Sequence, residues 1–379
     1  MAKNIHIAAI IPYVVYPAKM GGQKGIASFY QYLSELLPVT MIAAGNQQPD
    51  NFKGAFIPAL GTLKFRYANP FLIYRVKKII EKNKCTHLIL EHPYFGWLGI
   101  ILKRACNIKL VVHSHNIESL RFKSTGKWWW KLLWNYEKFT HQQSDINFFI
   151  TDEDRQYAIE NFRLNDARCF TITYGFEMNR LPSPEEKTAA RKKIESIHKI
   201  NPNEKILLFN GTLSYKPNLD AVDVIVKHIN PILQKERNFK YKIIICGKGL
   251  PVEYNALHAR SSENIIYAGF VDDISVYFKA CDIFLNPVTD GGGIKTKLVE
   301  ALGYNVNGVS TITGAIGIPG NVSGNKLTVT TNDWSAFATA IINTDASLQT
   351  PSAFFDHFYW GNIAKKAGDI LIDETYKTL

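Results

Sequence analysis

The chain has 379 residues, of which 46% are hydrophobic and 20% charged, so it has room for two globular domains and is not disordered, collagen-like or coiled-coil in composition. Lysine and arginine total 44 against 33 acidic residues, a formal net charge of +11, which favours an anionic partner: a nucleic acid, a phosphorylated small molecule or an acidic membrane face. The excess is uneven, because residues 1–180 carry 23 basic and 13 acidic side chains, whereas 181–379 carry 21 and 20.

In the first half of the chain, short apolar runs rich in β-branched residues alternate with longer amphipathic segments. This pattern predicts helices at 24–37, 70–82 and 127–143. The runs predict buried strands at 5–11, 39–43, 87–90, 110–113 and 146–150.

The second half repeats the alternation. Helices are expected near 218–236, 272–280, 295–303 and 332–343. Strands are expected at 206–209, 242–246, 265–267, 283–286 and 309–311. Near-continuous apolar strands separated by helices are typical of parallel sheets, so the sequence predicts two Rossmann-like α/β domains.

The two alternations meet at a Pro-rich polar stretch, 181–187, which is typical of a domain boundary. We therefore expect an N-terminal domain over 1–180 and a second domain over 181–353. The remaining segment, 354–379, is aromatic at its start and helical in pattern after it.

Several classes of protein are excluded by what the sequence lacks. No apolar stretch approaches the about 20 residues that a membrane-spanning helix needs. The N-terminus has no small-residue cleavage site, so a secretory signal is not expected. The five cysteines are scattered and form no CxxC pair, which argues against a disulfide framework or a zinc site. The pattern indicates a cytoplasmic protein with reduced cysteines.

The most informative stretch is Asp290-Gly-Gly-Gly-Ile-Lys-Thr-Lys297, which joins an expected strand to an expected helix. Glycines there let the backbone approach a ligand closely, and the first amides of a helix attract anions. Lys295 and Lys297 add positive charge. The spacing fits neither the Walker loop nor the GxGxxG motif, so the stretch indicates a diphosphate site or a glycine-rich turn with surface lysines.

Other small-residue loops follow strands of the second half. Gly211 and Lys216 follow the first strand, Gly247 follows the second, and the segment 310–320 follows the last. Ligands of open α/β sheets bind at the carboxyl ends of the strands, so these signals meet at one edge.

The order of these motifs resembles the GT-B glycosyltransferases, and within them the large retaining glycosyltransferase family 4, also called group 1. The resemblance implies an α/β fold with two Rossmann-like domains facing across a cleft, and a C-terminal helix in 354–379 that crosses back to the N-terminal domain. The residues that carry it are Gly21-Gly22, His115, Asn210-Gly211-Thr212, Gly247-Lys248-Gly249, Ala268 to Asp272, Ala280 to Asp282 and Glu300-Ala301-Leu302-Gly303.

The resemblance also implies roles for the matching residues. Glu300 corresponds to the second acid of the family's E-x7-E motif and would accept hydrogen bonds from the ribose of the donor. His115 would lie beside the transferred sugar, and Lys216 near a phosphate. The residues expected to act in catalysis are His115, Lys216, Asp290 and Lys295. Those expected to bind the nucleotide sugar are Gly21, Gly22, Gly211, Gly247, Val271, Gly292, Gly293, Ile294, Lys297 and Glu300.

This sequence departs from the family at the first acid of that motif, where it has Gly292. The first acid normally contacts the transferred sugar. We expect that either Asp290 or the backbone amides of the triple-glycine loop replace it, or that the donor specificity is altered.

Sugar transfer from a nucleoside diphosphate needs stabilisation of the departing diphosphate, and helix N-termini with lysines supply it without a metal. No cofactor other than the donor substrate is therefore expected. His113 and His115 form a His-x-His pair that could face a metal ion, but the sequence reveals no third ligand nearby, so no metal site is expected.

Residues 127–134, Lys-Trp-Trp-Trp-Lys-Leu-Leu-Trp, combine aromatic and basic side chains. They suit an interfacial membrane contact, or a helix packed on the sheet with one Trp exposed. Further basic residues of the first half are Lys64, Arg66, Arg75, Lys77 and Lys78.

The sequence therefore predicts a metal-independent hexosyltransferase that retains configuration and moves a sugar from a nucleoside-diphosphate sugar to a glycan or lipid-linked acceptor, in surface polysaccharide or glycolipid synthesis. A peripheral contact with the acidic inner membrane face is a further hypothesis, and a nucleic-acid partner is not expected because no such module is recognisable. The alternatives are a non-catalytic nucleotide-sugar or glycan-binding protein and a GT-B sugar-nucleotide epimerase. The epimerase would need several acids and histidines in its cleft, which the sequence does not reveal.

Overall fold

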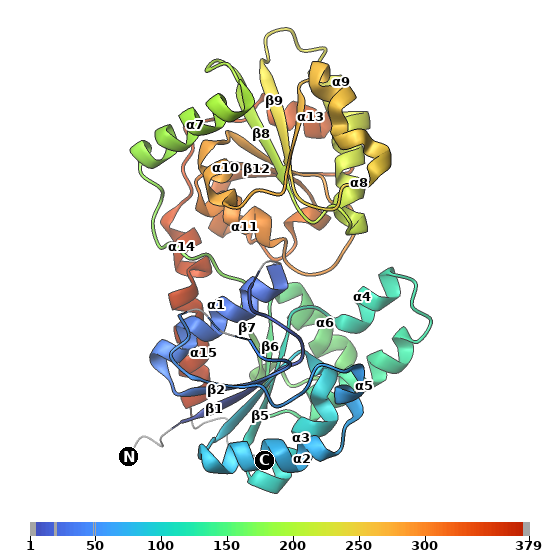
Figure 1. Cartoon of the computed structure of the whole chain (residues 1–379), viewed down its shortest axis with the longest axis vertical. Helices are drawn as coiled ribbons and strands as arrows, with labels where there is room; N and C mark the ends of the chain where they lie inside the picture. The colour runs from blue at the N-terminus through green and yellow to red at the C-terminus, as the bar shows by residue number, and fades with distance from the viewer. Residues whose placement is uncertain (1–4, 19–20, 48, 50, 374–379) are drawn as a thin grey trace. The chain divides into compact units, whose positions relative to one another are not determined.

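The computed structural model describes residues 5–18, 21–47, 49 and 51–373, and the chain forms two compact units (Figure 1). Unit 1 comprises Met1–Glu177 and Phe358–Leu379, and unit 2 comprises Met178–His357. The boundary expected at residue 180 lies close to the observed division.

Unit 1 is built on a seven-stranded parallel sheet with the order β3-β2-β1-β4-β5-β6-β7. Every residue of β1, β2 and β4 is buried, because helices cover both faces of the sheet. The strands are β1 (Ile7–Ile11), β2 (Val39–Ala43), β3 (Ala55–Ile57), β4 (His87–Glu91), β5 (Lys109–Ser114), β6 (Ile146–Phe149) and β7 (Cys169–Thr171).

The helices of unit 1 include one from the end of the chain, α15, which packs against α1 (Figure 1). Trp360 ties the start of α15 to the main domain, because its backbone N–H donates to the carbonyl of Phe176 at 3.1 Å. The α-helices are α1 (Gly21–Leu36), α2 (Phe71–Lys82), α3 (Gly96–Cys106), α4 (Glu118–Ser124), α5 (Trp130–Gln143), α6 (Asp152–Phe162) and α15 (Trp360–Ile372).

Unit 2 has a six-stranded parallel sheet with the order β10-β9-β8-β11-β12-β13. Its strands are β8 (Lys205–Asn210), β9 (Tyr241–Cys246), β10 (Ile265–Gly269), β11 (Ile283–Asn286), β12 (Asn307–Thr311) and β13 (Leu327–Thr330). Its α-helices are α7 (Pro184–His198), α8 (Lys216–Val224), α9 (Asn230–Leu233), α10 (Ile274–Ala280), α11 (Thr296–Gly303), α12 (Gly320–Ser323), α13 (Trp334–Ile342) and α14 (Ser352–Phe358).

All ten expected strands overlap observed ones, whereas β3, β7 and β13 were not predicted. These three have only three or four residues and are partly exposed, so they carry too little apolar pattern to be recognised. The helix expected at 218–236 is divided into α8, a π-helical segment at Ile225–Ile229, and α9. Pro231 lies at the start of α9 and has no N–H to donate to the preceding turn.

Two segments contain helices that the sequence did not predict. The Pro-rich stretch at 181–187 is not only a linker, because Ser183 and Glu186 form a capping box and Pro184 is the first residue of α7. The segment 354–379, expected to hold one helix, contains most of α14 and all of the described α15. The division between the units falls after His357, so α14 lies in unit 2 apart from Phe358, and α15 lies in unit 1. Among the described residues, no helix is both long and apolar enough to cross a membrane.

Candidate active site

The loops after β8, β9 and β10 are joined by backbone hydrogen bonds at the carboxyl edge of the unit 2 sheet. The Gly211 N–H donates to the Cys246 carbonyl at 3.0 Å, and the Gly247 N–H donates to the Gly269 carbonyl at 2.7 Å. Gly247 has a φ of 148°, and a Cβ there would collide with the carbonyl oxygen of Gly211. The glycines predicted at this edge therefore allow two loops to approach backbone to backbone.

Lys297 lies in the first turn of α11 and reaches into this group of loops. Its Nζ donates to the Asn210 carbonyl at 3.2 Å and to Oδ1 of Asn218 at 2.8 Å, and it lies 4.5 Å from the centre of the Phe209 ring. Burial lowers the pKa of Lys297 to about 7, and the charge of Lys295 acts in the same direction. In the part of the chain that the structure describes, no carboxylate pairs with Lys297, so its ammonium is suited to an anionic ligand.

Lys295 and Asp290 both bind within the triple-glycine loop. The Nζ of Lys295 donates to the carbonyls of Gly291 and Gly293 at 2.7 and 2.9 Å, while Oδ1 of Asp290 accepts the N–H of Gly291 at 2.6 Å. Gly291 and Gly293 have φ values of 96° and 67°, in the region that favours glycine. The loop is therefore closed on itself just before the N-terminus of α11.

Lys216 is the first residue of α8, and its side chain is 81% exposed. Its Nζ pairs with Oδ2 of Asp220 at 2.6 Å, which raises the pKa of Lys216, and Asp290 acts in the same direction. Tyr215 brings the same turn to the triple-glycine loop, because its hydroxyl would lie 3.4 Å from a Cβ on Gly291. Lys216 and Asp290 are thus near each other, although Lys216 already has a carboxylate partner.

The other residues predicted for the donor lie around this edge. Glu300 is in α11, one turn beyond Thr296, and is partly buried. Val271 and Ile294 are partly buried, Gly292 is exposed and Gly293 is buried.

Two amide side chains at this edge, Asn286 and Asn210, were not among the predicted site residues, although Asn210 belongs to the Asn210-Gly211-Thr212 motif. Asn286 ends β11, and its Nδ2 donates to the Gly314 carbonyl at 2.9 Å, which holds the segment 310–320 against the sheet. The Oδ1 atoms of Asn286 and Asn210 have no hydrogen-bond partner within the described chain. An asparagine at the end of an apolar run was the sequence signal for Asn286, and Asn210 also had the motif that it opens.

In unit 1, His113 and His115 converge on Glu91, the last residue of β4. Nδ1 of His113 lies 3.0 Å from Oε1 of Glu91, and Nε2 of His115 lies 2.6 Å from Oε2. The hydroxyl of Tyr30 also donates to Oε1, at 2.6 Å. Burial disfavours the carboxylate, but His113 and His115 hold the pKa of Glu91 well below its usual range. Burial lowers the pKa of His115 to about 4, so its ring is neutral at pH 7.

A second buried carboxylate, Glu118, extends this cluster. Burial disfavours its charge, but His92 and Arg121 hold the pKa of Glu118 well below its usual range. Nη2 of Arg121 lies 2.6 Å from Oε2 of Glu118, and Nδ1 of His92 lies 3.4 Å from Oε1. The rings of His92 and His115 have centroids 4.5 Å apart. His92 has a φ of 64°, a backbone conformation that non-glycine residues adopt mainly where the surroundings enforce it.

The structure corrects two expectations about this region. A third potential ligand does lie beside His113 and His115, since the ligand atoms of Glu91, His113 and His115 are all within 4.8 Å of one another. Acids and histidines are also gathered here, which the sequence did not reveal. These three residues could hold a metal by ligand type; as described, both oxygens of Glu91 already accept hydrogen bonds.

Gly21 and Gly22 begin α1 and do not form a separate loop after the first strand. A Cβ on Gly22 would make only an ordinary contact, 3.7 Å from the Tyr13 hydroxyl. That hydroxyl lies 3.2 Å from Nε2 of His92, so the start of α1 adjoins the histidine cluster.

Two family models match the chain, one in each unit. The model described as "Glycosyltransferase Family 4" matches residues 21–180, and the one described as "Glycosyl transferases group 1" matches residues 204–344. The chain belongs to the group 1, or family 4, glycosyltransferases.

Relatives of similar length support this membership. The chain is 29% identical to an uncharacterized 44.6 kDa protein in the cps region of Klebsiella pneumoniae, with 90% of this chain and 91% of that protein covered. It is 22% identical to the O-antigen biosynthesis glycosyltransferase WbnH of Escherichia coli, with 77% and 78% covered.

Solved structures show the same fold. A glycosyltransferase from Rickettsia africae matches with a TM-score of 0.72 at 15% identity, over 97% of this chain and 98% of that one. HepE of Anabaena, in complex with UDP and glucose, matches with a TM-score of 0.67 at 15% identity, over 97% and 99%. The two parallel sheets are therefore the two Rossmann-like domains of a GT-B glycosyltransferase.

Proposed function

We propose that this glycosyltransferase moves a hexose from a nucleoside-diphosphate sugar to a glycan or lipid-linked acceptor, with retention of configuration, in the synthesis of a surface polysaccharide or glycolipid. The observation that carries the proposal is Lys297, a half-buried lysine without a carboxylate partner in the described chain, among glycine loops at the carboxyl edge of unit 2. UDP-sugars are the first donors to test, because HepE was solved with UDP and glucose.

The donor diphosphate is assigned to the carboxyl edge of unit 2. Backbone amides at the start of α11 and the ammonium of Lys297 stabilise the charge that develops on the leaving diphosphate. Glu300 accepts hydrogen bonds from the ribose, as the family resemblance implies. No metal is assigned to this step, and transfer that persists unchanged with excess EDTA is the expected result.

In the reaction, the bond between the sugar C1 and the phosphate oxygen breaks, and its electron pair leaves with the nucleoside diphosphate. The acceptor hydroxyl attacks C1 from the same face and forms the glycosidic bond, while its proton passes to the leaving phosphate oxygen. Retention follows from attack on the face that the phosphate leaves, without a protein nucleophile.

Glu91 acts through His115. A buried carboxylate that accepts the Nε2 proton of His115 fixes the tautomer and the orientation of its ring, so that Nδ1 is the unprotonated nitrogen. We assign His115 to contact with the transferred sugar and Glu91 to the positioning of His115. We also propose that Asp290 takes the place of the missing first acid of the E-x7-E motif.

The acceptor is assigned to unit 1, because nearly all of the net positive charge of the chain lies in residues 1–180. Large apolar side chains are exposed on α2, on the segment before it, just before α5 and in the first turn of α5. The helix α3 packs against both α2 and α5. Lys123 and Lys131 both lie over the Trp130 ring, at 4.8 and 5.8 Å from its centre. The exposed side chains are Leu63 (77%), Phe65 (63%), Phe71 (80%), Tyr74 (65%), Trp128 (83%) and Leu132 (67%).

Exposed aromatic and leucine side chains beside lysines match the chemistry of an acidic membrane surface, so we propose peripheral membrane association through this face. Pelleting with vesicles of a zwitterionic lipid and with vesicles containing acidic lipid tests it. The Trp128→Ser, Phe71→Ser double variant should pellet several-fold less with acidic vesicles. Equal recovery of wild type with both vesicle types at low salt would contradict the association.

The enzymatic proposal is tested by incubating the protein with UDP-, GDP- and ADP-sugars and measuring binding and slow donor hydrolysis. At least one donor should bind and be hydrolysed, and Glu300→Ala should abolish both. Binding without any turnover would instead favour a non-catalytic nucleotide-sugar-binding protein, and it would match the missing first acid at Gly292.

A further inference from the structure

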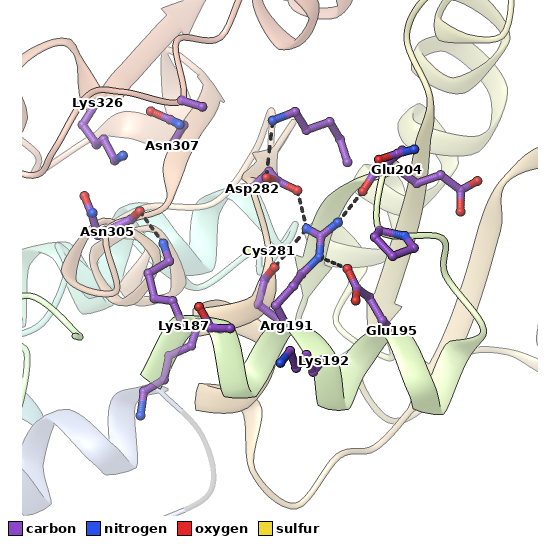
Figure 2. Close-up of a pocket in the computed structure, with 17 residues that line it drawn as sticks. Lys187, Arg191, Lys192, Glu195, Glu204, Cys281, Asp282, Asn305, Asn307 and Lys326 are labelled. Atoms are coloured by element: carbon purple, nitrogen blue, oxygen red, sulfur yellow. Dashed lines mark hydrogen bonds and ion pairs between the residues drawn. The ribbon is translucent and has the colours of Figure 1, made fainter. Parts of the chain in front are cut away.

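A pocket of about 530 Å³ lies at the opposite edge of the unit 2 sheet from the loops described above (Figure 2). Lys205 begins β8, Asn307 begins β12, and Lys326 directly precedes β13, so the pocket opens at the amino ends of the strands. The helix α7 contributes Lys187 and Arg191. A five-residue strand is about 16 Å long, so this pocket is separate from the candidate donor site.

One half of the pocket neutralises its own charges. Arg191 binds Oε1 of Glu195 at 2.6 Å and Oδ2 of Asp282 at 2.7 Å, as Figure 2 shows. Oδ1 of Asp282 also lies 3.5 Å from Nζ of Lys205, and Glu204 pairs with Lys242 at 3.7 Å. The three acids that line the pocket therefore all have basic partners.

The other half has two lysines that donate hydrogen bonds to backbone carbonyls. Lys187 donates to the Asn305 carbonyl at 3.1 Å, and Lys326, only 3% exposed, donates to the Leu348 carbonyl at 2.5 Å. Neither has a carboxylate within 4 Å in the part of the chain that is described. An ammonium has three N–H donors, so each lysine keeps donors for a ligand.

The lowered pKa of Lys326 shows that its positive charge is poorly compensated by the surrounding protein. Burial lowers its pKa to about 8, the charge of Lys187 acts in the same direction, and Asp345 opposes both. A bound anion would offset both the burial and the mutual repulsion of the two lysines.

Asn307 supplies a further polar group in this pocket. Its side chain is only 6% exposed and lines the pocket beside Lys326 (Figure 2), yet its amide makes no hydrogen bond to any described residue. The amide of Asn307 opens into the pocket, so it can donate a hydrogen bond to an anion that binds there.

We propose that this pocket binds a phosphate group, with its oxygens held by Lys187, Lys326 and the amide of Asn307. Two ammonium groups and an amide match the double charge and the several acceptor oxygens of a phosphate monoester better than a single carboxylate. The volume lies within the range of about 300–1,000 Å³ that is usual for small-molecule sites, so a phosphorylated sugar fits as well as free phosphate.

The experiment is calorimetric titration of the full chain with inorganic phosphate, glucose 6-phosphate and acetate. Asn307→Ala is the main variant, because it removes a side chain without hydrogen bonds and leaves the fold intact. We expect it to weaken phosphate binding about tenfold, Lys326→Met to weaken it further, and acetate not to bind. Lys227→Met, which removes an exposed charge outside this pocket, and Lys297→Met, at the donor site, should leave binding unchanged.

Tighter binding of glucose 6-phosphate than of phosphate would identify an organic phosphate as the occupant, and equal affinities would identify the free ion. Absence of saturable binding of both at about 1 mM would overturn the proposal. Binding that Lys297→Met abolishes and Asn307→Ala leaves unchanged would overturn it as well, because the phosphate would then occupy the donor site.

Discussion

The two units present polar groups at the carboxyl edges of similar parallel sheets, but the chemistry of the two edges differs. In unit 1 two buried carboxylates, Glu91 and Glu118, are surrounded by histidines, tyrosines and an arginine. In unit 2 the edge consists of glycine loops, backbone amides and Lys297. Under the proposed function the two edges have different tasks: unit 1 orients the transferred sugar through His115, and unit 2 stabilises the negative charge of the leaving diphosphate.

The largest effect is expected from Lys297→Met, which tests whether charge stabilisation resides in unit 2. Loss of one preorganised donor to a developing anion typically costs about 10²–10³ in rate, so transfer should fall by that factor. Initial rates at saturating donor measure it, and Lys227→Met is the matched control for removal of one charge. A rate that stays within twofold of wild type would place the charge stabilisation elsewhere.

Glu91→Gln tests the unit 1 edge. It replaces the acceptor of the His115 and His113 protons, so kcat should fall about 10²-fold, while the KM for the donor stays unchanged. Tyr30→Phe is the control, because it removes one hydrogen bond from Glu91 and leaves both histidines paired. If KM rises and kcat does not change, Glu91 belongs to donor binding and the division of tasks is wrong.

Gly247→Ala tests whether the close approach of two loops holds the donor site together. The φ of 148° and the collision with the Gly211 carbonyl should reduce the free energy of unfolding of unit 2 by about 1–3 kcal/mol and weaken nucleotide binding. Urea unfolding measures it. Gly320→Ala serves as control, because a Cβ there meets nothing within 4 Å, and it should behave as wild type.

The two units should also respond to pH in different ranges. Burial lowers the pKa values of His87, His115 and His141 to about 4, so their contribution to stability is lost as the pH falls from 6.5 towards 4. Glu137 opposes this loss of stability. Burial raises its pKa to about 7, so on acidification the folded state takes up this proton at a higher pH than the unfolded state does. In unit 2, Lys297 and Lys326, with pKa values of about 7 and 8, reduce stability as the pH falls below 10.5.

Hydrogen exchange at pH 7.5 and 5 measures this difference strand by strand. Protection should fall about tenfold more in β4 and β5 than in β8 and β9 on acidification. An equal loss in both sheets would show that the buried histidines do not govern the acid response.

The strands and the glycine loops could be predicted from sequence because apolar runs and glycines are local signals. The contacts of Lys297 could not be predicted, since its partners Asn210 and Asn218 are about 80 residues away in the chain. The same holds for Glu91, which meets His113 and His115 only because β4 and β5 are neighbours in the sheet. Its one local signal was a charged residue at the end of an apolar strand. Lys216 was placed near a phosphate by the family resemblance, although its offset differs from the family's usual basic pair, and in the structure it pairs with Asp220 one turn later.

The most direct test of the division between the units measures donor binding and transfer together in two variants, Glu91→Gln and Glu300→Ala. We expect that Glu91→Gln binds the nucleotide sugar with wild-type affinity but transfers it poorly, whereas Glu300→Ala fails to bind it. Loss of donor binding in Glu91→Gln, or full binding and transfer in Glu300→Ala, would contradict it.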